Sequence, residues 1–322
     1  MQKNKYSVIK ISEQKKESIV SKLDFSSLYQ RKASIHGTCI KLFCQNPEFV
    51  DMWDENFRMM NEDIRPHARI FSLSDSSKQL KVLFESESKT VFIYNCEYYG
   101  WVKSLALSLA SEYLFDSPSV ESRRYSIHGS YVDFLGRGIA IMGMPKAGKT
   151  TLTYGLLASD KSSSFLTDDW FFVRFMGEGV RVFSAEKNSY AGSDIAQNWP
   201  ELISKIKNLK KDGHGRAIMD VSRLFGQTRI RNQSEFSALV ILTRNPSLPA
   251  WSSLSKKEAL SLLSKWDFCN PHQLTRTPKR KKAQIQFFSS LLERIPVYLL
   301  NTIETPAKSL ERLNDTISAI KP

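Results

Sequence analysis

The sequence IAIMGMPKAGKTTLTY, at residues 139–154, decides the fold of this chain. Its apolar start predicts a buried strand that stops at Gly143, and a helix is expected from Lys149 onward. Between them lies the spacing G-x-x-x-x-G-K-[ST], in which glycines let backbone N–H groups turn inward around a phosphate. The helix N-terminus would add unpaired N–H groups and a positive dipole end. The stretch therefore predicts a phosphate-binding loop; the alternative is an ordinary strand-to-helix turn that contains glycine.

Both backbone and side chains are expected to hold a nucleotide in this loop. The Lys149 ammonium group is expected near the β and γ oxygens, and the Thr150 hydroxyl is expected to ligate Mg²⁺. ATP and Mg²⁺ are thus the predicted cofactors. The predicted nucleotide-binding residues are Gly143, Pro145, Lys146, Ala147, Gly148, Lys149, Thr150 and Thr151.

The composition is that of an ordinary globular chain. Its 322 residues suffice for two domains, and 41% hydrophobic and 25% charged residues are usual proportions. No apolar run reaches about 18 residues, so no membrane span is expected, and the start lacks the apolar core of a secretory signal. Because the cysteines are scattered, they suit reduced thiols, and we expect a cytoplasmic protein. These cysteines are Cys39, Cys44, Cys96 and Cys269.

A net charge of +13 favours acidic partners, among them nucleotides, nucleic acid and acidic protein surfaces. The densest basic run, RTPKRKK at residues 276–282, is predicted to be a solvated loop between helices. A patch that meets an anionic substrate is the alternative for this run. Nucleic acid is compatible with the charge, but the sequence has no aromatic strand motif of the kind that binds RNA.

Two domains are predicted, an N-terminal α+β module at residues 1–120 and a catalytic α/β domain at residues 121–322. The first is expected to begin with a partly ordered arm over residues 1–35 that contains a short helix. Its remaining elements are strands at residues 39–43, 69–73, 80–85 and 90–94 and helices at residues 48–60 and 98–115. A polar segment with Pro118 marks the joint.

The second domain alternates strands and helices, which is typical of an α/β fold. Strands are expected at residues 125–134, 139–142, 164–175, 180–184, 216–221, 238–242 and 297–300. The acidic pair described below interrupts the 164–175 segment. Helices are expected at residues 151–157, 201–209, 256–263, 283–293 and 307–320.

The acidic pair Asp168-Asp169 follows an apolar strand that comes after the loop helix. One carboxylate there could orient Mg²⁺ through water, and the other could accept the proton of an incoming hydroxyl. The alternative is a turn between two strands, where Asp is common. His128 lies on an earlier strand, where a single His is more often structural than catalytic. Gly129, directly after it, would permit a close backbone approach.

The order of these motifs resembles the catalytic domain of HPr kinase/phosphorylase. The shared segments are His128-Gly129, the hairpin Gly136-Arg137-Gly138, the loop at residues 143–150 and Leu166-Thr167-Asp168-Asp169. A later stretch, RAIMDVSRLFG at residues 216–226, is similar to the family's segment that ends in DVRRLFG. The resemblance covers residues 125–242. It implies a P-loop fold related to phosphoenolpyruvate carboxykinase and phosphoryl transfer to a hydroxyl group.

The resemblance also implies roles for individual residues. Lys149 would contact the phosphates and Thr150 would hold Mg²⁺. Asp168 would be the general base, Asp169 would support the metal, and His128 would lie beside the transferred phosphate. The chain departs from the family at residues 212–215, where Asp-Gly-His-Gly replaces Glu-x-Arg-Gly, and at residues 144–147 within the loop. Residues 276–282 do not match the C-terminal family signature.

These departures favour the diverse HPr-kinase-related kinases over the carbon-regulation enzyme. Glu186 and Asn188 follow a predicted strand end, where α/β proteins collect ligands, although a plain strand-to-helix connection is the alternative. Arg216, Arg231 and Arg244 are candidates for stabilising charge during transfer, and the sequence does not rank them.

The predicted function is an ATP- and Mg²⁺-dependent kinase without phosphorylase activity. The acceptor would be a Ser or Thr of a protein or peptide, or a small molecule that carries a hydroxyl group. A nucleotide-gated protein that binds RNA or another anionic partner is the alternative, and a degenerate kinase scaffold is a third reading. Because the relatives assemble into oligomers, a homo-oligomer would fit the resemblance.

Overall fold

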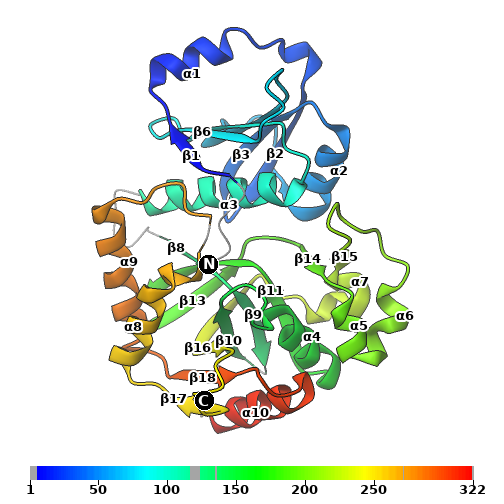
Figure 1. The fold of residues 1–322 in the computed structure, drawn as a ribbon, viewed down its shortest axis with the longest axis vertical. Helices are drawn as coiled ribbons and strands as arrows, with labels where there is room; N and C mark the ends of the chain where they lie inside the picture. The colour runs from blue at the N-terminus through cyan, green and yellow to red at the C-terminus, as the bar shows by residue number, and fades with distance from the viewer. Residues whose placement is uncertain (1–5, 117–123, 135, 271, 321–322) are drawn as a thin grey trace. The chain divides into compact units, whose positions relative to one another are not determined.

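The structure, a computed structural model, describes residues 6–116, 124–134, 136–270 and 272–320 (Figure 1). It is mixed α/β, which confirms the predicted class. The chain divides into two compact units. The first combines residues 1–124 with residues 185–187 and 271–276, and the second contains the rest. The predicted boundary between residues 120 and 121 lies outside the described residues.

In its described part, the first unit contains a seven-stranded sheet in the order β1-β6-β7-β5-β3-β2-β4. The strands are β1 (Val8–Lys10), β2 (Tyr29–Ile35), β3 (Thr38–Cys44), β4 (Arg58–Met59), β5 (Ala68–Leu73), β6 (Lys81–Glu85) and β7 (Thr90–Tyr94). Its helices are α1 (Glu13–Val20), α2 (Pro47–Asn56) and α3 (Tyr99–Phe115). The apolar helix α3 packs on β3, β5 and β7, while α1 covers the other face (Figure 1).

The short helix expected within residues 1–35 is α1, but the expectation that this segment is a partly ordered arm is wrong for the residues described. Val8 of β1 pairs in parallel with Val82, and β2 lies inside the sheet between β3 and β4. Ala33 and Ile35 are fully buried, so the strand has one core-facing side. In the sequence, the Lys and Ser residues of β2 obscure the strand pattern, because apolar residues occupy only every second position of a half-buried strand.

In the second unit, the described residues form a nine-stranded sheet in the order β11-β9-β10-β16-β13-β12-β8, with β18 beside β16 and β17 beside β18. The strands are β8 (Tyr125–His128), β9 (Ser130–Phe134), β10 (Arg137–Gly143), β11 (Ser163–Thr167), β12 (Trp170–Met176), β13 (Gly179–Ser184), β16 (Gln233–Thr243), β17 (Trp251–Ser253) and β18 (Val297–Asn301). Because β10, β16 and β18 are parallel, their carboxyl ends meet at one edge.

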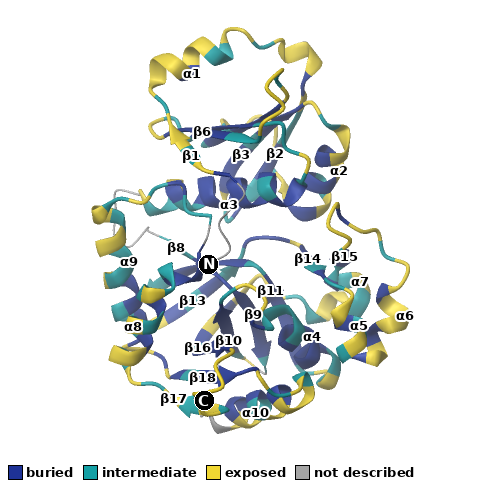
Figure 2. Ribbon diagram, viewed as in Figure 1, coloured by how far each residue is buried: buried dark blue, intermediate teal, exposed yellow. Residues whose placement is uncertain are grey.

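Helices cover both faces of this sheet, and the strands between them are largely buried (Figure 2). On one face lie α4 (Lys149–Ser159), α5 (Asp194–Asn198) and α10 (Pro306–Ala319). On the other lie α8 (Lys256–Lys265) and α9 (Pro278–Leu291). A separate two-stranded sheet pairs β14 (Asn188–Ala191) with β15 (Ala217–Asp220), and the short helices α6 (Ile203–Ile206) and α7 (Val221–Phe225) lie nearby in the chain.

Three predicted elements of the second unit need correction. The basic run at residues 276–282 is not a loop throughout, because Thr277 caps α9 and Pro278 takes its first turn. The strand expected over residues 125–134 is two strands that Gly129 separates. The helix expected over residues 201–209 is reduced to the 3₁₀ helix η2 (Pro200–Leu202) followed by α6. None of the described helices combines the length and apolarity needed to cross a membrane.

Candidate functional site

The 143–150 loop connects the end of β10 to the start of α4, as the sequence predicts. Its two glycines have different physical roles. Gly143 lies against β16, and a β-carbon there would be 3.0 Å from both the Cβ and the backbone oxygen of Leu242. Gly148 caps α4 with a φ of +101°, in the left-handed region that disfavours side chains. The loop therefore needs a small residue at one end and a permissive backbone at the other.

The end of β18 anchors this loop. The Thr302 hydroxyl donates to the backbone oxygen of Ala147 at 2.7 Å. The Arg244 Nε in turn donates to the backbone oxygen of Thr302 at 3.2 Å. Thr302 and Arg244 come directly after β18 and β16, so the shared edge of the parallel strands fixes the loop conformation.

The Lys149 side chain folds back onto the loop. Its ammonium group donates to the backbone oxygens of Gly143 at 3.0 Å and of Met144 at 3.4 Å. Burial lowers the pKa of Lys149, while the charge of Asp169 opposes that shift. The loop thus holds a partly desolvated cation within electrostatic reach of the acidic pair.

Asp168 lies directly after β11 and is buried, with 7% of its surface exposed. Its Oδ1 accepts a hydrogen bond from the Ser130 hydroxyl at 2.8 Å, and its Oδ2 accepts one from the Ser189 hydroxyl at 2.7 Å. Burial raises the pKa of Asp168 to about 6, although the hydroxyl groups of Ser189, Ser130 and Thr150 favour the charged form. The hydroxyl groups of Ser130 and Ser189 thus hold the two oxygens of this carboxylate.

Asp169 is more accessible and pairs with His128. The Nε2 of His128 lies 3.2 Å from the Oδ1 of Asp169, and the Asp169 side chain is 40% exposed. The backbone N–H of Gly129 donates to the backbone oxygen of Asp169 at 2.9 Å. A β-carbon on Gly129 would lie 2.8 Å from the backbone oxygen of Ile141, so the close packing of residue 129 against Ile141 requires glycine.

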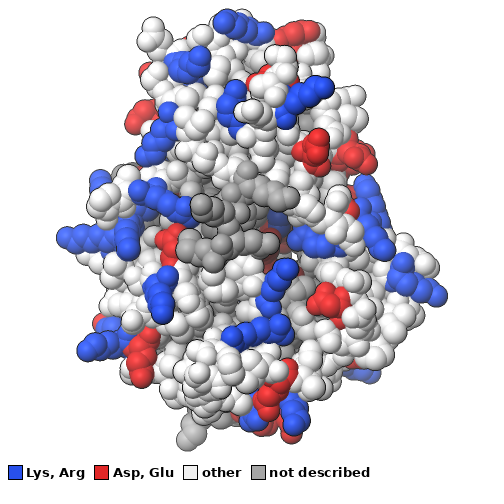
Figure 3. Space-filling model, viewed as in Figure 1, with Lys and Arg blue, Asp and Glu red and all other residues white. Residues whose placement is uncertain are grey.

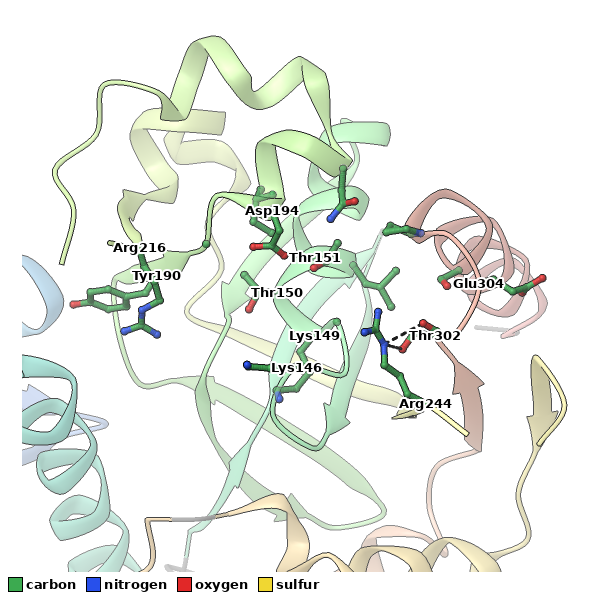
Figure 4. Close-up of a pocket in the computed structure, with 17 residues that line it drawn as sticks. Lys146, Lys149, Thr150, Thr151, Tyr190, Asp194, Arg216, Arg244, Thr302 and Glu304 are labelled. Carbon is green, nitrogen blue, oxygen red and sulfur yellow. Dashed lines mark hydrogen bonds between the residues drawn. The ribbon is translucent and has the colours of Figure 1, made fainter. Parts of the chain in front are cut away.

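The loop forms the floor of a pocket of about 510 Å³ (Figure 4). On one side the Arg216 guanidinium lies 5.2 Å from the centre of the Tyr190 ring and is paired with Asp212 at 2.7 Å. Arg244 occupies the other side, next to Thr302 (Figure 4). The lining also includes Lys146, Lys149, Thr150, Thr151, Asp194, Asn198 and Glu304.

The structure does not bring every predicted site residue to this pocket. Arg216 and Arg244 line it, whereas the predicted catalytic residues Asp168, Asp169 and His128 do not. Asn188 pairs with Asp220 between β14 and β15. Arg231 lies beside β11, where its backbone N–H donates to the backbone oxygen of Phe165. Glu186 belongs to the first unit, in a buried ion pair of 2.7 Å with Lys103.

Three residues around the loop are not predicted from the sequence: Ser130, which holds Asp168, and Asp194 and Thr302, which line the pocket. Ser189, which also holds Asp168, and Tyr190, which lines the pocket, belong to the segment EKNSY at residues 186–190, which follows a predicted strand end. A hydroxyl residue two positions after His128 is the available signal for Ser130. Nothing local marks Asp194 and Thr302, because the fold brings them to the loop.

The oxygen atoms at the loop suit a magnesium ion that arrives with a nucleotide. In the part of the chain that the structure describes, no group of three or more His, Cys, Asp or Glu side chains could hold a metal on its own. Mg²⁺ usually takes one or two protein oxygens and completes its shell with phosphate and water. The Thr150 hydroxyl at the start of α4 and the Asp168 carboxylate directly after β11 are oxygen ligands of the kind that fits this requirement.

Comparisons with known proteins point to one family. The HPr kinase/phosphorylase of Variovorax paradoxus (strain S110) is 26% identical over 126 residues, which cover 39% of this chain and 33% of that protein. The HPr kinase/phosphorylase of Polaromonas naphthalenivorans (strain CJ2) is 24% identical over 127 residues, covering 39% and 34%. The solved structure of the Hpr(Ser) kinase/phosphatase from Coxiella burnetii gives a TM-score of 0.35 at 15% identity, covering 60% of this chain and 96% of that one. No protein-family model matches the chain.

The fold and the site define an α/β protein with a glycine-bounded loop between a buried strand and a helix, next to an acidic pair. The sequence similarity supports an HPr-kinase-like family for the chain, which confirms the resemblance predicted from the motifs. The chain spans about a third of the length of the curated relatives that it matches.

Proposed function

We propose that this protein is a kinase that transfers the terminal phosphoryl group of ATP to a hydroxyl group with the help of Mg²⁺. The observation that carries the proposal is that the acidic pair, in which Asp169 is paired with His128, lies within electrostatic reach of Lys149 in the 143–150 loop. A loop of this kind also occurs in proteins that only bind or hydrolyse nucleotides. A metal-side oxygen pair next to a more accessible carboxylate is what phosphoryl transfer to an alcohol requires.

The burial of the two carboxylates supports a division of labour that reverses the one expected from the sequence. Both oxygens of Asp168 accept hydrogen bonds, so Asp168 is poorly placed to receive a proton from a substrate. In P-loop proteins a loop Thr and an acidic residue on a neighbouring strand hold Mg²⁺, and Thr150 and Asp168 would take these two roles. The side chain of Asp169 is 40% exposed and has the His128 imidazole beside it. Asp169 is therefore our candidate for the proton acceptor, with His128 orienting it.

The cationic side chains that line the pocket would bind and orient the phosphates. Bound ATP and Mg²⁺ supply the phosphoryl group and neutralise its charge. Lys149 would leave the backbone oxygens of Gly143 and Met144 and turn toward the phosphates, which are stronger acceptors. Arg244 and Arg216 lie on opposite walls of the same pocket, so either guanidinium could stabilise charge on the transferred group (Figure 4).

A protein acceptor is the substrate class that we propose first. The names of the matched relatives describe kinases of the protein HPr. Because the match is partial, we propose a Ser or Thr hydroxyl of a protein or peptide without naming it, and a small hydroxylated molecule remains an outcome of the test. We further propose that the protein works in the cytoplasm; homo-oligomer formation stays a prediction.

The function can be tested with γ-labelled ATP and a cell extract that is separated into protein, nucleic-acid and metabolite fractions. We expect Mg²⁺-dependent labelling of a protein or metabolite by the wild-type chain and none by Lys149→Ala. Release of labelled phosphate without labelling of any fraction would contradict a kinase and leave a nucleotide hydrolase. The Lys161→Ala variant, which removes an exposed lysine of the same unit, is the matched control.

A further inference from the structure

We propose that Ser130 and Ser189 are positioning residues that hold the Asp168 carboxylate in one orientation and so set the affinity of the site for Mg²⁺. This inference rests on the proposed function, because it concerns the metal that accompanies the nucleotide. Neither serine belongs to the 143–150 loop, and neither lines the pocket. Both would act through Asp168.

The two hydroxyl groups hold one carboxylate from two separate sheets. Ser130 begins β9, and the pairing of Thr167 with Tyr131 brings it beside Asp168. Its hydroxyl lies 2.8 Å from the Asp168 Oδ1 and 3.0 Å from the Asp168 backbone oxygen, so it contacts both ends of the residue. Ser189 approaches the Oδ2 from β14, which pairs with β15. Together they define the plane of the carboxylate.

Both serine hydroxyl groups are buried, which strengthens their effect on Asp168. Ser130 is fully buried and Ser189 is 2% exposed, so bulk water has little access to replace either hydroxyl group. A hydrogen bond to a charged group is stronger than one between neutral groups, and its loss leaves an incompletely solvated carboxylate. With either serine truncated, Asp168 would lose part of its fixed orientation and one of the donors that stabilise its charged form.

β14 also links this clamp to the pocket. Ser189 and Tyr190 are consecutive in a strand, where neighbouring side chains point to opposite faces. Ser189 contacts Asp168 on one face, and the Tyr190 ring lines the pocket under the Arg216 guanidinium on the other (Figure 4). One short strand therefore carries both a pocket wall and a support for the metal-side carboxylate.

The test is a Mg²⁺ titration of the ATP-dependent increase in Tm for the full chain. In Ser130→Ala and in Ser189→Ala, we expect the Mg²⁺ concentration that gives half of the increase to rise about tenfold. The increase that ATP gives in EDTA should be unchanged, because the loop and Lys149 are intact. Ser163→Ala is the matched control, since Ser163 is fully buried in β11 and its hydroxyl bonds to the backbone oxygens of Leu156 and Asp160.

A double-mutant cycle separates positioning from general destabilisation. In the Asp168→Asn background, Ser189→Ala should change the Mg²⁺ midpoint by less than about twofold, because the group through which it acts is gone. An unchanged midpoint in both single Ser variants, an equal change in Ser163→Ala, or full additivity in the cycle would overturn the inference. If wild type shows no ATP-dependent increase at any Mg²⁺ concentration, the proposed function fails as well, so the two failures are distinguishable.

Discussion

At the scale of single residues, the buried Asp168 carboxylate decreases the stability of the folded protein when it is charged. Burial raises the pKa of Asp168 to about 6, above the usual range for an Asp side chain. A raised carboxyl pKa means that the folded state binds the proton more tightly than the unfolded state does. The free energy of unfolding therefore falls as pH rises from about 4 to about 6, and this group accounts for about 3 kcal/mol of the loss.

This linkage gives the first prediction. At pH 4 wild type and Asp168→Asn should have similar free energies of unfolding, and at pH 7.5 the variant should be more stable by up to about 3 kcal/mol. Urea unfolding of both proteins at the two pH values measures the difference. Glu235→Gln, which removes an exposed carboxyl group of the same unit, is the control. The same pH dependence in wild type and Asp168→Asn would contradict the burial argument.

The second prediction concerns Lys149, whose ammonium group contacts the backbone of the 143–150 loop. Lys149→Ala should weaken ATP binding by at least about tenfold, because charge-assisted contacts to the phosphates are lost. Calorimetric titration with ATP and Mg²⁺ measures the affinity, with Lys161→Ala as the control. Retention of wild-type affinity in Lys149→Ala would mean that phosphates do not occupy the 143–150 loop.

Residue spacing allowed the loop and the acidic pair to be predicted, but not the groups around them. The loop residues and Asp168-Asp169 are continuous in the sequence, so their chemistry can be read there. Ser130 and Ser189 lie 38 and 21 positions from Asp168, and only strand pairing unites the three. The sequence predicts Glu186 at the site because it follows a strand end, but residues 185–187 belong to the first unit.

At the scale of elements, the parallel strands β10, β16 and β18 explain why the site forms at one edge. Each delivers a functional segment at its carboxyl end: the 143–150 loop, Arg244 and Thr302 respectively. The close approach of β10 to β16 at Gly143 leaves no room for a side chain. The geometry of the loop therefore depends on a packing contact as well as on its own backbone.

The third prediction follows from this contact. Gly143→Ala should destabilise the protein by about 1–3 kcal/mol, because its β-carbon would crowd Leu242 at 3.0 Å, and it should also weaken ATP binding. Thermal unfolding and ATP titration measure the two effects. Gly179→Ala is the control, since its β-carbon would lie 3.5 Å from the backbone oxygen of Met176, an ordinary contact. Equal behaviour of the two variants would refute the packing argument.

Long periodic elements were predictable, whereas capped or edge elements were not. The apolar pattern of α3 and the runs that form β5, β7 and β10 match the structure closely. The start of α9 was missed because a run of basic residues is unfavourable at a helix N-terminus. Thr277 and Pro278 override that cost as cap and first residue, so the helix begins before its apolar stripe.

At the scale of the whole molecule, the net charge of +13 left an RNA-binding alternative open. On the face drawn in Figure 3, Lys and Arg side chains are interspersed with Asp and Glu. The fourth prediction is that labelled RNA is retained on filters weakly and equally with and without ATP. Retention that requires ATP and falls steeply with added salt would favour the nucleotide-gated alternative.

The most direct test of phosphoryl transfer by the acidic pair compares Asp169→Asn with wild type in the γ-labelled ATP assay. If Asp169 accepts the proton beside a nucleotide seated in the 143–150 loop, the variant should lose at least about a hundredfold in transfer rate. Its affinity for ATP with Mg²⁺ should stay within about threefold of wild type, since Thr150, Lys149 and Asp168 are unchanged. Transfer at the wild-type rate by Asp169→Asn would contradict the account.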